Sequence, residues 1–237
     1  MDTSTQTASG ATHQGHVRSR NEDAFWIGTT SWVVADGMGG CPSGHLASGQ
    51  AVRSIARVLE GSEDIEWAML EAVLTAHTDI ERSAKRWPAH AGMGTTAVAA
   101  HRNAAGDVGI THVGDSRAYL LAGGQLRRLT TDDNEAADLV ARGEITEQGA
   151  REHPGQSWLT KALGLQQEVA PFPTIQVLSR PSGRLLLCTD GLTGEVEEHE
   201  IETLLSVGSP QESCEALIAA ALADGARDNV TVVVVDL

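Results

Sequence analysis

Short apolar runs in this 237-residue chain stop abruptly at aspartate. The run WVVA ends at Asp36, the run LLLC ends one residue before Asp190, and glycine follows both aspartates. In related patterns, Asp115 follows an alternating segment and Asp228 lies just before the run VTVVVV. A strand fixes a carboxylate in space, and glycine lets the backbone approach a ligand closely. We therefore predict that these four aspartates, far apart in sequence, form one oxygen-rich metal site.

The other apolar positions predict both strands and helices. Two-residue periodicity and continuous apolar runs predict strands over residues 5–12, 24–28, 31–36, 95–103, 107–116, 117–124, 125–130, 174–179, 184–189 and 230–235. Helical spacing predicts helices over residues 43–59, 62–86, 132–142, 146–154, 197–206 and 211–223. The short gap between 24–28 and 31–36 predicts a hairpin. Glycine-containing turns between residues 95 and 130 favour an antiparallel meander.

Polar residues mark the predicted helix boundaries. Ser43 is a candidate N-cap for the helix over 43–59, and Asp132 or Asp133 is one for the helix over 132–142, which Gly143 would end. The segment 131–164 is more polar than its surroundings and is predicted to leave the sheet. There is no repeat, low-complexity tract or linker, so we expect one domain over residues 1–237.

Composition narrows the classes of partner and compartment. The formal net charge is −15, from 32 acidic and 17 basic residues, which argues against nucleic acid and anionic membranes as partners but suits cations. No apolar run approaches the roughly 18–20 residues of a membrane span, and the N-terminus lacks signal-peptide features. Cys41, Cys188 and Cys214 are odd in number and lack metal-ligand spacing. We expect reduced thiols in a cytoplasmic protein.

Carboxylates without histidine or cysteine at ligand spacing suit Mg²⁺ or Mn²⁺ better than Zn²⁺. Several aspartates at one place would repel each other unless cations lie between them. Two such ions, about 3.5–4 Å apart, would activate a water and hold the oxygens of a phosphoryl group during in-line displacement. An arginine could hold those oxygens bidentately, and Arg18 and Arg20 are the arginines nearest to the first acidic cluster.

Each of these residues also has an ordinary structural interpretation. A single Asp-Gly is most often a turn, and only the repetition at strand ends favours Asp36 and Asp190 as ligands. Asp115 could cap a turn beside Arg117, and Asp228 could belong to a turn before its strand. The remaining charges could lie on solvated surface, a description that fits Glu22, Asp23 and Arg18.

Other chemical motifs are absent or lack their context. GMGTTA fits a loose dinucleotide-binding pattern, but no apolar strand precedes it. The nine histidines form no pair at metal-ligand or nucleophile–base spacing, and the sequence contains neither a P-loop nor G-x-S-x-G.

Eight segments, taken together, identify a family. They are GHVRSRNEDAF, VVADGMGG, GTTAVAA, THVGDSRAYLL, LTTDDNEAADLVARGEIT, HPGQSWLTKALG, LLLCTDGLTGEV and ARDNVTVVVV. In order and approximate spacing, across nearly the whole chain, they resemble the metal-dependent protein phosphatases of the protein phosphatase 2C type, in their compact bacterial form. One segment would be a weak signal, but eight in register are highly specific.

The resemblance implies an α+β fold, a sandwich of two antiparallel β-sheets flanked by helices in four layers (αββα). It also implies a binuclear Mn²⁺/Mg²⁺ centre at one end. By position, Asp36 would bridge both ions and Gly37 would contribute its carbonyl. Asp190 and Asp228 would complete the shell of the first ion, and Glu22 would act on the second through water.

The same resemblance assigns roles around the centre. Arg18 matches the phosphate-binding arginine, and Asp115 with Asp190 matches a weaker third-metal site. Residues 131–164 would form a flap beside the active site, linked to substrate choice.

The chain departs from the family pattern at four places. Met38 stands where some members have a histidine proposed as general acid, so the acid that protonates the leaving group has no assigned residue. His13 stands where bacterial relatives usually have aspartate, and residues 132–134 read Asp-Asp-Asn in place of Asp-His-Ser. Gly194 stands where some relatives have another acid.

These observations predict a cytoplasmic, monomeric serine/threonine phosphoprotein phosphatase that hydrolyses phosphomonoesters by direct attack of an activated water. Its substrates would be phosphorylated Ser/Thr proteins, and a bacterial Ser/Thr kinase would be its counterpart. One alternative is a phosphatase of an anti-sigma-factor antagonist, although such relatives usually lack the flap. The others are a pseudophosphatase that binds phosphoproteins and a cation-binding structural domain, which would not need Arg18.

Overall fold

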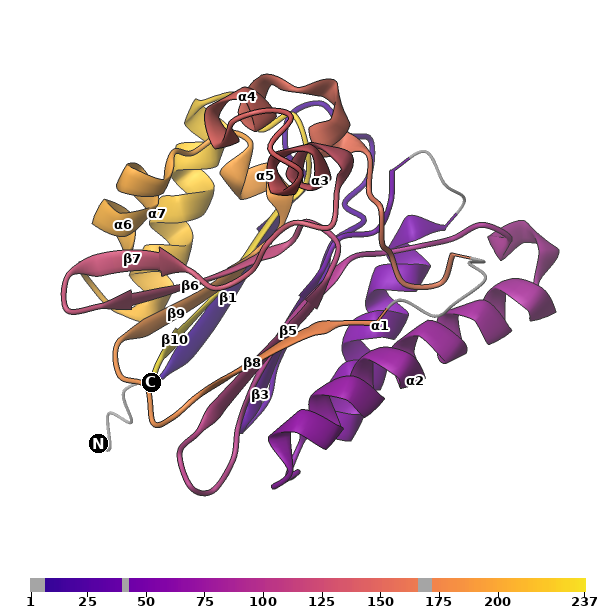
Figure 1. Cartoon of the computed structure of the whole chain (residues 1–237), viewed down its shortest axis with the longest axis horizontal. Coiled ribbons are helices and arrows are strands. Elements are labelled where there is room, and N and C mark those ends of the chain that lie inside the picture. The colour runs from indigo at the N-terminus through magenta and orange to yellow at the C-terminus, as the bar shows by residue number, and fades with distance from the viewer. Residues whose placement is uncertain (1–6, 40–42, 166–171) are drawn as a thin grey trace.

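The computed structural model describes residues 7–39, 43–165 and 172–237, and two five-stranded antiparallel sheets form its centre (Figure 1). The first sheet contains, in spatial order, β1 (Ala8–His13), β10 (Val230–Asp236), β9 (Arg184–Cys188), β6 (Arg117–Ala122) and β7 (Gln125–Arg128). The second contains β2 (Ala24–Ile27), β3 (Ser31–Ala35), β4 (Ala97–Arg102), β5 (Val108–Val113) and β8 (Thr174–Leu178). The helices are α1 (Gly44–Leu59), α2 (Ile65–Arg86), α3 (Glu135–Ala141), α4 (Glu147–Glu152), α5 (Asp190–Thr193), α6 (Glu198–Leu205) and α7 (Pro210–Ala223), with 3₁₀ turns at Pro88–His90 and Pro154–Ser157.

Side chains on both faces of each sheet are buried, which explains the continuous apolar runs. In β10, Val233 and Val235 face the other sheet, whereas Val232 and Val234 pack toward α6 and α7. On the other side of the sandwich, α1 and α2 pack on the sheet that contains β3. The order of layers is therefore helix, sheet, sheet, helix, and the predicted α+β sandwich is confirmed. Alternate side chains of one strand serve two apolar layers.

The predicted meander over residues 95–130 is wrong as a single sheet. β4 pairs with β5 in one sheet, and β6 pairs with β7 in the other. The chain changes sheets at Gly114, whose φ of +101° lies in a region that glycine adopts readily and other residues rarely do. A Cβ on Gly114 would also lie 2.6 Å from the Thr96 side chain. Glycine turns of similar length serve hairpins and sheet changes alike, so turn spacing did not reveal the change.

One predicted capping bond and one predicted helix start differ from the structure. Ser43 precedes α1, but it has φ +65° and its side chain makes no capping hydrogen bond. The helix predicted to begin at residue 62 begins at Ile65, where the Asp64 side chain accepts a hydrogen bond from the Trp67 amide. The N-cap is therefore an aspartate two residues after the predicted start.

The helix predicted to be capped by Asp132 or Asp133 is capped by Asn134, whose side chain accepts from the Ala137 amide. The two aspartates are engaged in ion pairs instead. Thr146 caps α4 as predicted, and Gly143 follows α3 with φ +72°.

The predicted hairpin is confirmed by the antiparallel pairing of β2 with β3. The first predicted strand starts outside the described residues, and its described part forms β1. Gly40 and Cys41 also lie outside them, whereas Cys188 and Cys214 are buried free thiols. Among the helices that the structure describes, none has the length and apolar character needed to cross a membrane.

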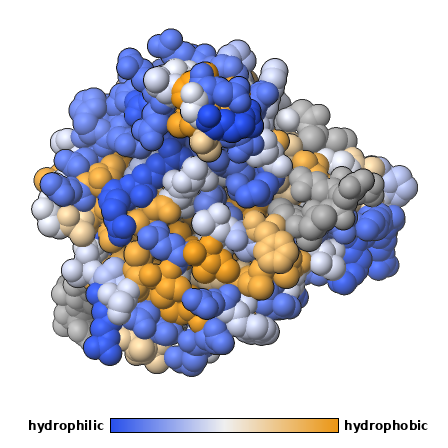
Figure 2. Space-filling view, in the orientation of Figure 1, coloured by the Kyte–Doolittle hydropathy of each residue, from blue (hydrophilic) through white to orange (hydrophobic). Residues whose placement is uncertain are grey.

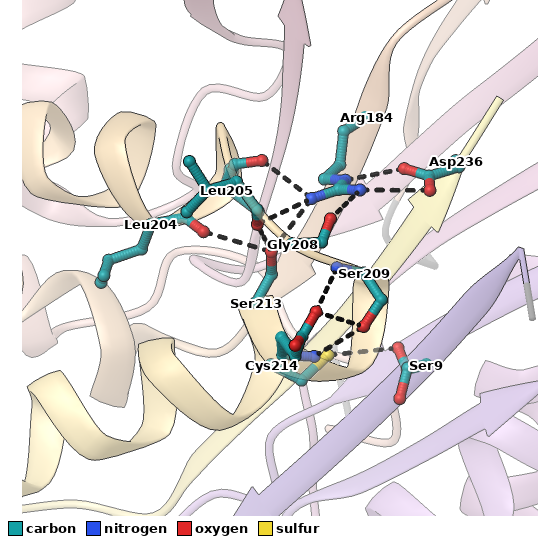
Figure 3. A network of polar contacts seen from close by, with 11 residues as sticks. Ser9, Arg184, Leu204, Leu205, Gly208, Ser209, Ser213, Cys214 and Asp236 are labelled. Carbon is teal, nitrogen blue, oxygen red and sulfur yellow. Dashed lines mark hydrogen bonds and ion pairs between the residues drawn. The ribbon is translucent and has the colours of Figure 1, made fainter.

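An arginine network closes the end of the sandwich where β9 begins (Figure 3). Arg184 donates from Nε and Nη2 to the two carboxylate oxygens of Asp236, at 2.7 and 3.1 Å. It also donates to the carbonyls of Leu205 and Gly208 and to the Ser213 hydroxyl, at 3.0, 3.0 and 3.1 Å. One side chain thereby ties β9 and β10 to the turn between α6 and α7.

Candidate metal centre

The four predicted aspartates lie at the same end of the two sheets. Asp36 follows β3, Asp115 follows β5, Asp190 follows β9, and Asp228 precedes β10. Antiparallel pairing of β9 with β10 places the end of one strand beside the start of the other, and with them Asp190 beside Asp228. The packing of the two sheets brings Asp36 and Asp115 to the same place. The backbone of Asp36 is fixed from β4, where the Thr96 amide donates to the Asp36 carbonyl at 2.9 Å.

The electrostatics of this end show how closely the carboxylates approach. Burial, then the negative charges of Asp23, Asp190 and Asp115, raise the pKa of Asp36 well above its usual value. Burial, then the charge of Asp228, raise the pKa of Asp190. For Asp115, burial and then the charge of Asp190 raise the pKa. Like charges at close range disfavour ionisation, so the cluster has unmet demand for positive charge.

Two orphaned oxygens show that a cation fits this cluster. Oδ1 of Asp190 and Oδ1 of Asp23 are buried and accept no hydrogen bond from the residues that the structure describes. Buried carboxylate oxygens without a partner are costly, and a hard divalent cation would satisfy them. The backbone of Gly37 lies close to the backbone of Glu22 and of Gly44. A Cβ on Gly37 would lie 2.5 Å from the carbonyl oxygen of each.

The side chains are not yet arranged as a ligand shell. Within residues 7–39, 43–165 and 172–237, no three His, Cys, Asp or Glu side chains are placed to hold a metal ion together. One reason is visible at Asp228, whose Oδ2 lies 2.5 Å from Nη2 of Arg18. The donor types in the cluster fit Mg²⁺ or Mn²⁺.

Arg18 lies at the centre, where the family resemblance placed it. The hydrogen bond to Asp228, together with the charges of Asp36 and Asp190, raises the pKa of Arg18. A Cβ on Gly39 would lie 2.5 Å from Nη1 of this arginine, so glycine leaves the guanidinium its space. Arg18 acts here as the local cation of the acidic cluster.

Asp23 belongs to the centre, although the sequence suggested a solvated face. Its Oδ2 accepts hydrogen bonds from the hydroxyls of Thr189 and Thr231, at 3.0 and 2.7 Å. Burial, with the charge of Asp190, raises the pKa of Asp23 to about 7. The predicted hairpin contained the missing signal, because pairing Ala24 with Ala35 brings residues 23 and 36 to the same edge.

Asn229 is a second residue that the sequence interpretation missed. Its side chain donates to the carbonyls of Gln14 and Arg20, at 2.8 and 3.0 Å, and accepts from the Glu22 amide at 2.8 Å. It is 4% exposed. Asn229 therefore holds the loop between β1 and β2, which carries Arg18, against the start of β10.

Glu22 lies at the edge of the cluster. Its Oε1 is 3.7 Å from Nδ1 of His45 on α1, and its carbonyl accepts from the Ser48 hydroxyl at 2.5 Å. The backbone of Glu22 is thus fixed, and the residue lines a cleft together with Arg18 and Arg20.

The segment 131–164 is attached directly beside Asp115. The Asp133 carboxylate accepts from the Gly114 amide at 3.0 Å and from Lys161 at 2.6 Å. Asp132 pairs with Arg117 at 2.8 Å. Figure 2 shows a largely hydrophilic surface where α3 and α4 lie, in contrast to the apolar residues gathered lower on this face. Residues 131–164 contribute α3, α4 and a 3₁₀ turn, and Asp133 ties them to the chain next to Asp115.

Comparisons with known proteins agree with this geometry. Residues 8–219 match the family described as protein phosphatase 2C. The chain is 38% identical over 226 residues to the serine/threonine protein phosphatase PstP of Mycobacterium tuberculosis, covering 94% of this chain and 43% of that relative. It is 37% identical over 237 residues to the serine/threonine phosphatase stp of Listeria monocytogenes, covering 95% of this chain and 93% of that relative.

Solved structures of PstP have the same fold. One crystal structure matches with a TM-score of 0.90 and 35% identity over 97% of each chain. The PstP catalytic domain in complex with 2 manganese ions matches with a TM-score of 0.87 and 34% identity, over 97% of this chain and 96% of that one.

Proposed function

This chain belongs to the protein phosphatase 2C family, and from that premise we propose that it is a metal-dependent phosphatase of phosphoserine and phosphothreonine proteins. The observation that carries the proposal is the convergence of Asp36, Asp190, Asp228 and Arg18 at one end of the sandwich. A structural cation site would need the carboxylates but not the arginine. The names of the relatives and the two manganese ions of PstP support the same reaction.

We propose that the centre holds two Mn²⁺ or Mg²⁺ ions, which would supply Lewis-acid activation of water and neutralise phosphate charge. Asp36 would hold both ions, the Gly37 carbonyl would add a ligand, and Glu22 would act through water. Asp190 and Asp228 would complete the first site. Asp115 is proposed for a weaker third ion.

The protein residues would orient the phosphoryl group. Once Asp228 turns toward a cation, Arg18 is free to bind two phosphate oxygens with its fork of N–H donors. The backbone of Asp36, fixed by Thr95 and Thr96, would keep its carboxylate in place during the reaction. Such positioning lowers the entropic part of the barrier.

Direct attack by water is supported by the two cysteines that the structure describes. Burial raises the pKa of Cys188 to about 12 and that of Cys214 to about 11. Neither is therefore a thiolate nucleophile near neutral pH. These buried free thiols also support the proposal of a cytoplasmic location.

We further propose that residues 1–237 act as one catalytic domain and as a monomer, with residues 131–164 as the flap. The flap's attachment next to Asp115 supports a phosphatase that opposes a Ser/Thr kinase, rather than one that acts on anti-sigma-factor antagonists. The chain spans less than half of PstP, so this assignment is for the part whose sequence is given.

The test is phosphate release from a phosphothreonine peptide, with and without Mn²⁺. We expect release that requires Mn²⁺ in the wild-type protein and is lost in Asp190→Asn, with the fold retained by circular dichroism. Arg18→Ala should raise KM more than it lowers kcat. Release by Asp190→Asn at the wild-type rate would contradict the proposal, and Mn²⁺ binding without release would favour a phosphoprotein-binding module.

A further inference from the structure

The cleft beside the metal centre contains an arginine to which none of the roles above is assigned. The cleft has a volume of about 360 Å³ and is lined by Arg18, Ser19, Arg20 and Glu22. Both arginines are exposed and face the same cleft. Because Arg18 is the proposed phosphate ligand, any role of Arg20 toward a substrate rests on the proposed function. Arg20 would meet whatever lies next to the phosphoryl group of a bound substrate.

The two arginines differ in how their charge is neutralised. Arg18 pairs with Asp228 at 2.5 Å. No ion pair among the described residues includes Arg20. Its side chain contacts instead the ring nitrogens of His45, both 3.1 Å from Nη1. The Arg20 guanidinium is therefore a positive charge without a paired carboxylate in the described part of the chain.

Arg20 is nevertheless held in place at two points. Its carbonyl accepts from the Asn229 side chain at 3.0 Å, which fixes the backbone. The His45 ring holds Nη1, and the Glu22 carboxylate lies 3.7 Å from Nδ1 of that ring. The Nε and Nη2 side of the fork remains available, already ordered, for a ligand.

We propose that Arg20 is a specificity-determining residue that binds a second anionic group of the phosphoprotein substrate, close in sequence to the phosphorylated residue. That group would be a carboxylate or a second phosphate, since both match the planar fork of a guanidinium. The overall charge of −15 repels acidic substrates, so an unpaired positive charge at the cleft gives them a local point of attachment.

The size of the effect follows from exposure. An exposed charge pair contributes little and is screened by salt, whereas a bidentate pair with an ordered arginine contributes more. We expect a preference of roughly three- to tenfold in kcat/KM for the substrate with the second anion. The preference should shrink as ionic strength rises.

The experiment compares phosphothreonine peptides that differ only in flanking charge. The first peptide has neutral flanking residues. A set of peptides carries a single aspartate, each at a different position within about three residues of the phosphothreonine. The last peptide carries phosphoserine at the position where aspartate gives the highest kcat/KM. An extended chain of that length reaches about 10 Å. The measured quantity is the ratio of kcat/KM for each anionic peptide to that for the neutral one.

We expect a ratio of roughly three to ten in the wild-type protein at the best position, falling to about one in Arg20→Gln. Arg20→Lys keeps the charge without the fork and should give an intermediate ratio. Arg102→Gln is the matched control. It removes the same charge, but Arg102 ends β4 at the opposite end of the sandwich. A wild-type ratio of one at every position, or a ratio that Arg20→Gln leaves unchanged, overturns the inference.

Failure of the proposed function would give a different result. If no peptide is hydrolysed, the same peptides are labelled and their binding is measured by fluorescence anisotropy. Tighter binding of the anionic peptide that is lost in Arg20→Gln supports the Arg20 site in a protein that binds without hydrolysis. Equal affinities for all peptides overturn it. A response to phosphoserine but not to aspartate identifies the second group as phosphate.

Discussion

Strand β9 has opposite environments at its two ends. At its start, Arg184 is surrounded by acceptors and pairs with Asp236 of β10 through two hydrogen bonds (Figure 3). Just beyond its other end, Asp190 lies among like charges, has an orphaned oxygen and shows a raised pKa. The two sites are only about 20 Å apart along the strand. The first end is satisfied within the protein, and the second is left in need of positive charge.

The contrast separates the end of the sandwich that stabilises the fold from the end that binds a ligand. Buried polar groups in folded proteins are normally satisfied, so a cluster that is not marks a site that binds something. The apolar layers and the Arg184 network stabilise a scaffold that tolerates the repulsion among Asp23, Asp36 and Asp190. The changes below, from the largest expected effect to the smallest, test this division.

The largest effect is expected from Asp36→Asn. Activity should fall by on the order of 100–1000-fold, because a charged group that contacts the reacting centre is lost. Without added metal, the same change should raise the free energy of unfolding by about 1–2 kcal/mol, since one of several repelling charges is removed. Phosphate release and urea unfolding measure the two quantities.

Asp236→Asn is the matched control at the other end of the sheet. It should retain activity and lose stability, the reverse of Asp36→Asn, because it weakens the pair with Arg184. The same response to both substitutions would remove the distinction between the two ends.

Arg184→Ala should lower the free energy of unfolding by about 3 kcal/mol while kcat stays within about twofold. The change leaves Asp236 without its partner and removes donors from two carbonyls. Arg57→Ala removes an exposed pair with Asp79 and should cost less than about 1 kcal/mol. Equal losses in the two variants would show that the network adds nothing beyond a surface ion pair.

The acidic end should also make stability depend on pH. The pKa of Asp23 rises from 3.8 to about 7 on folding, so the folded protein without metal binds more protons than the unfolded chain in that range. The stabilising contribution is complete below about pH 4 and is lost as pH rises through about 7. We expect a loss on the order of 2 kcal/mol between pH 5 and pH 7.5 in chelator-treated protein, measured by urea unfolding.

Asp23→Asn should reduce the slope of this dependence, because the substituted group does not titrate. The raised pKa values of Asp36, Asp115 and Asp190 leave a remaining slope of the same sign. Saturating Mn²⁺ should reverse it, since cations favour the ionised carboxylates. Parallel pH curves for wild type and Asp23→Asn would contradict the assignment of the slope to Asp23.

The smallest effect is expected at the attachment of segment 131–164, where the acidic end is satisfied. Lys161→Met removes one partner of Asp133 but leaves its hydrogen bond from Gly114. We expect a loss of about 1 kcal/mol, with faster amide exchange confined to residues 131–164. Unchanged exchange there would show that the pair does not hold the segment.

Local patterns in the sequence predict most of the helices and strands and the positions of the four aspartates at strand ends. Apolar runs that end at Asp36 and Asp190 indicated a site because strand ends fix side chains, and eight segments in order indicated the family. The hairpin of β2 and β3 followed from a short gap in the pattern. All of these are local signals, carried by residues that lie next to each other in the chain.

Which strands beyond the β2–β3 hairpin are neighbours, and which charges meet, depends on tertiary packing. β5 and β6 adjoin in sequence but belong to different sheets, because turn length does not encode the partner strand. The pairs Arg18–Asp228 and Arg184–Asp236 join residues 210 and 52 positions apart. The burial of Asp23 likewise depends on hydroxyls from β10 and the end of β9. The packing of the two sheets sets the surroundings of each charged side chain, and no short stretch of sequence specifies that packing.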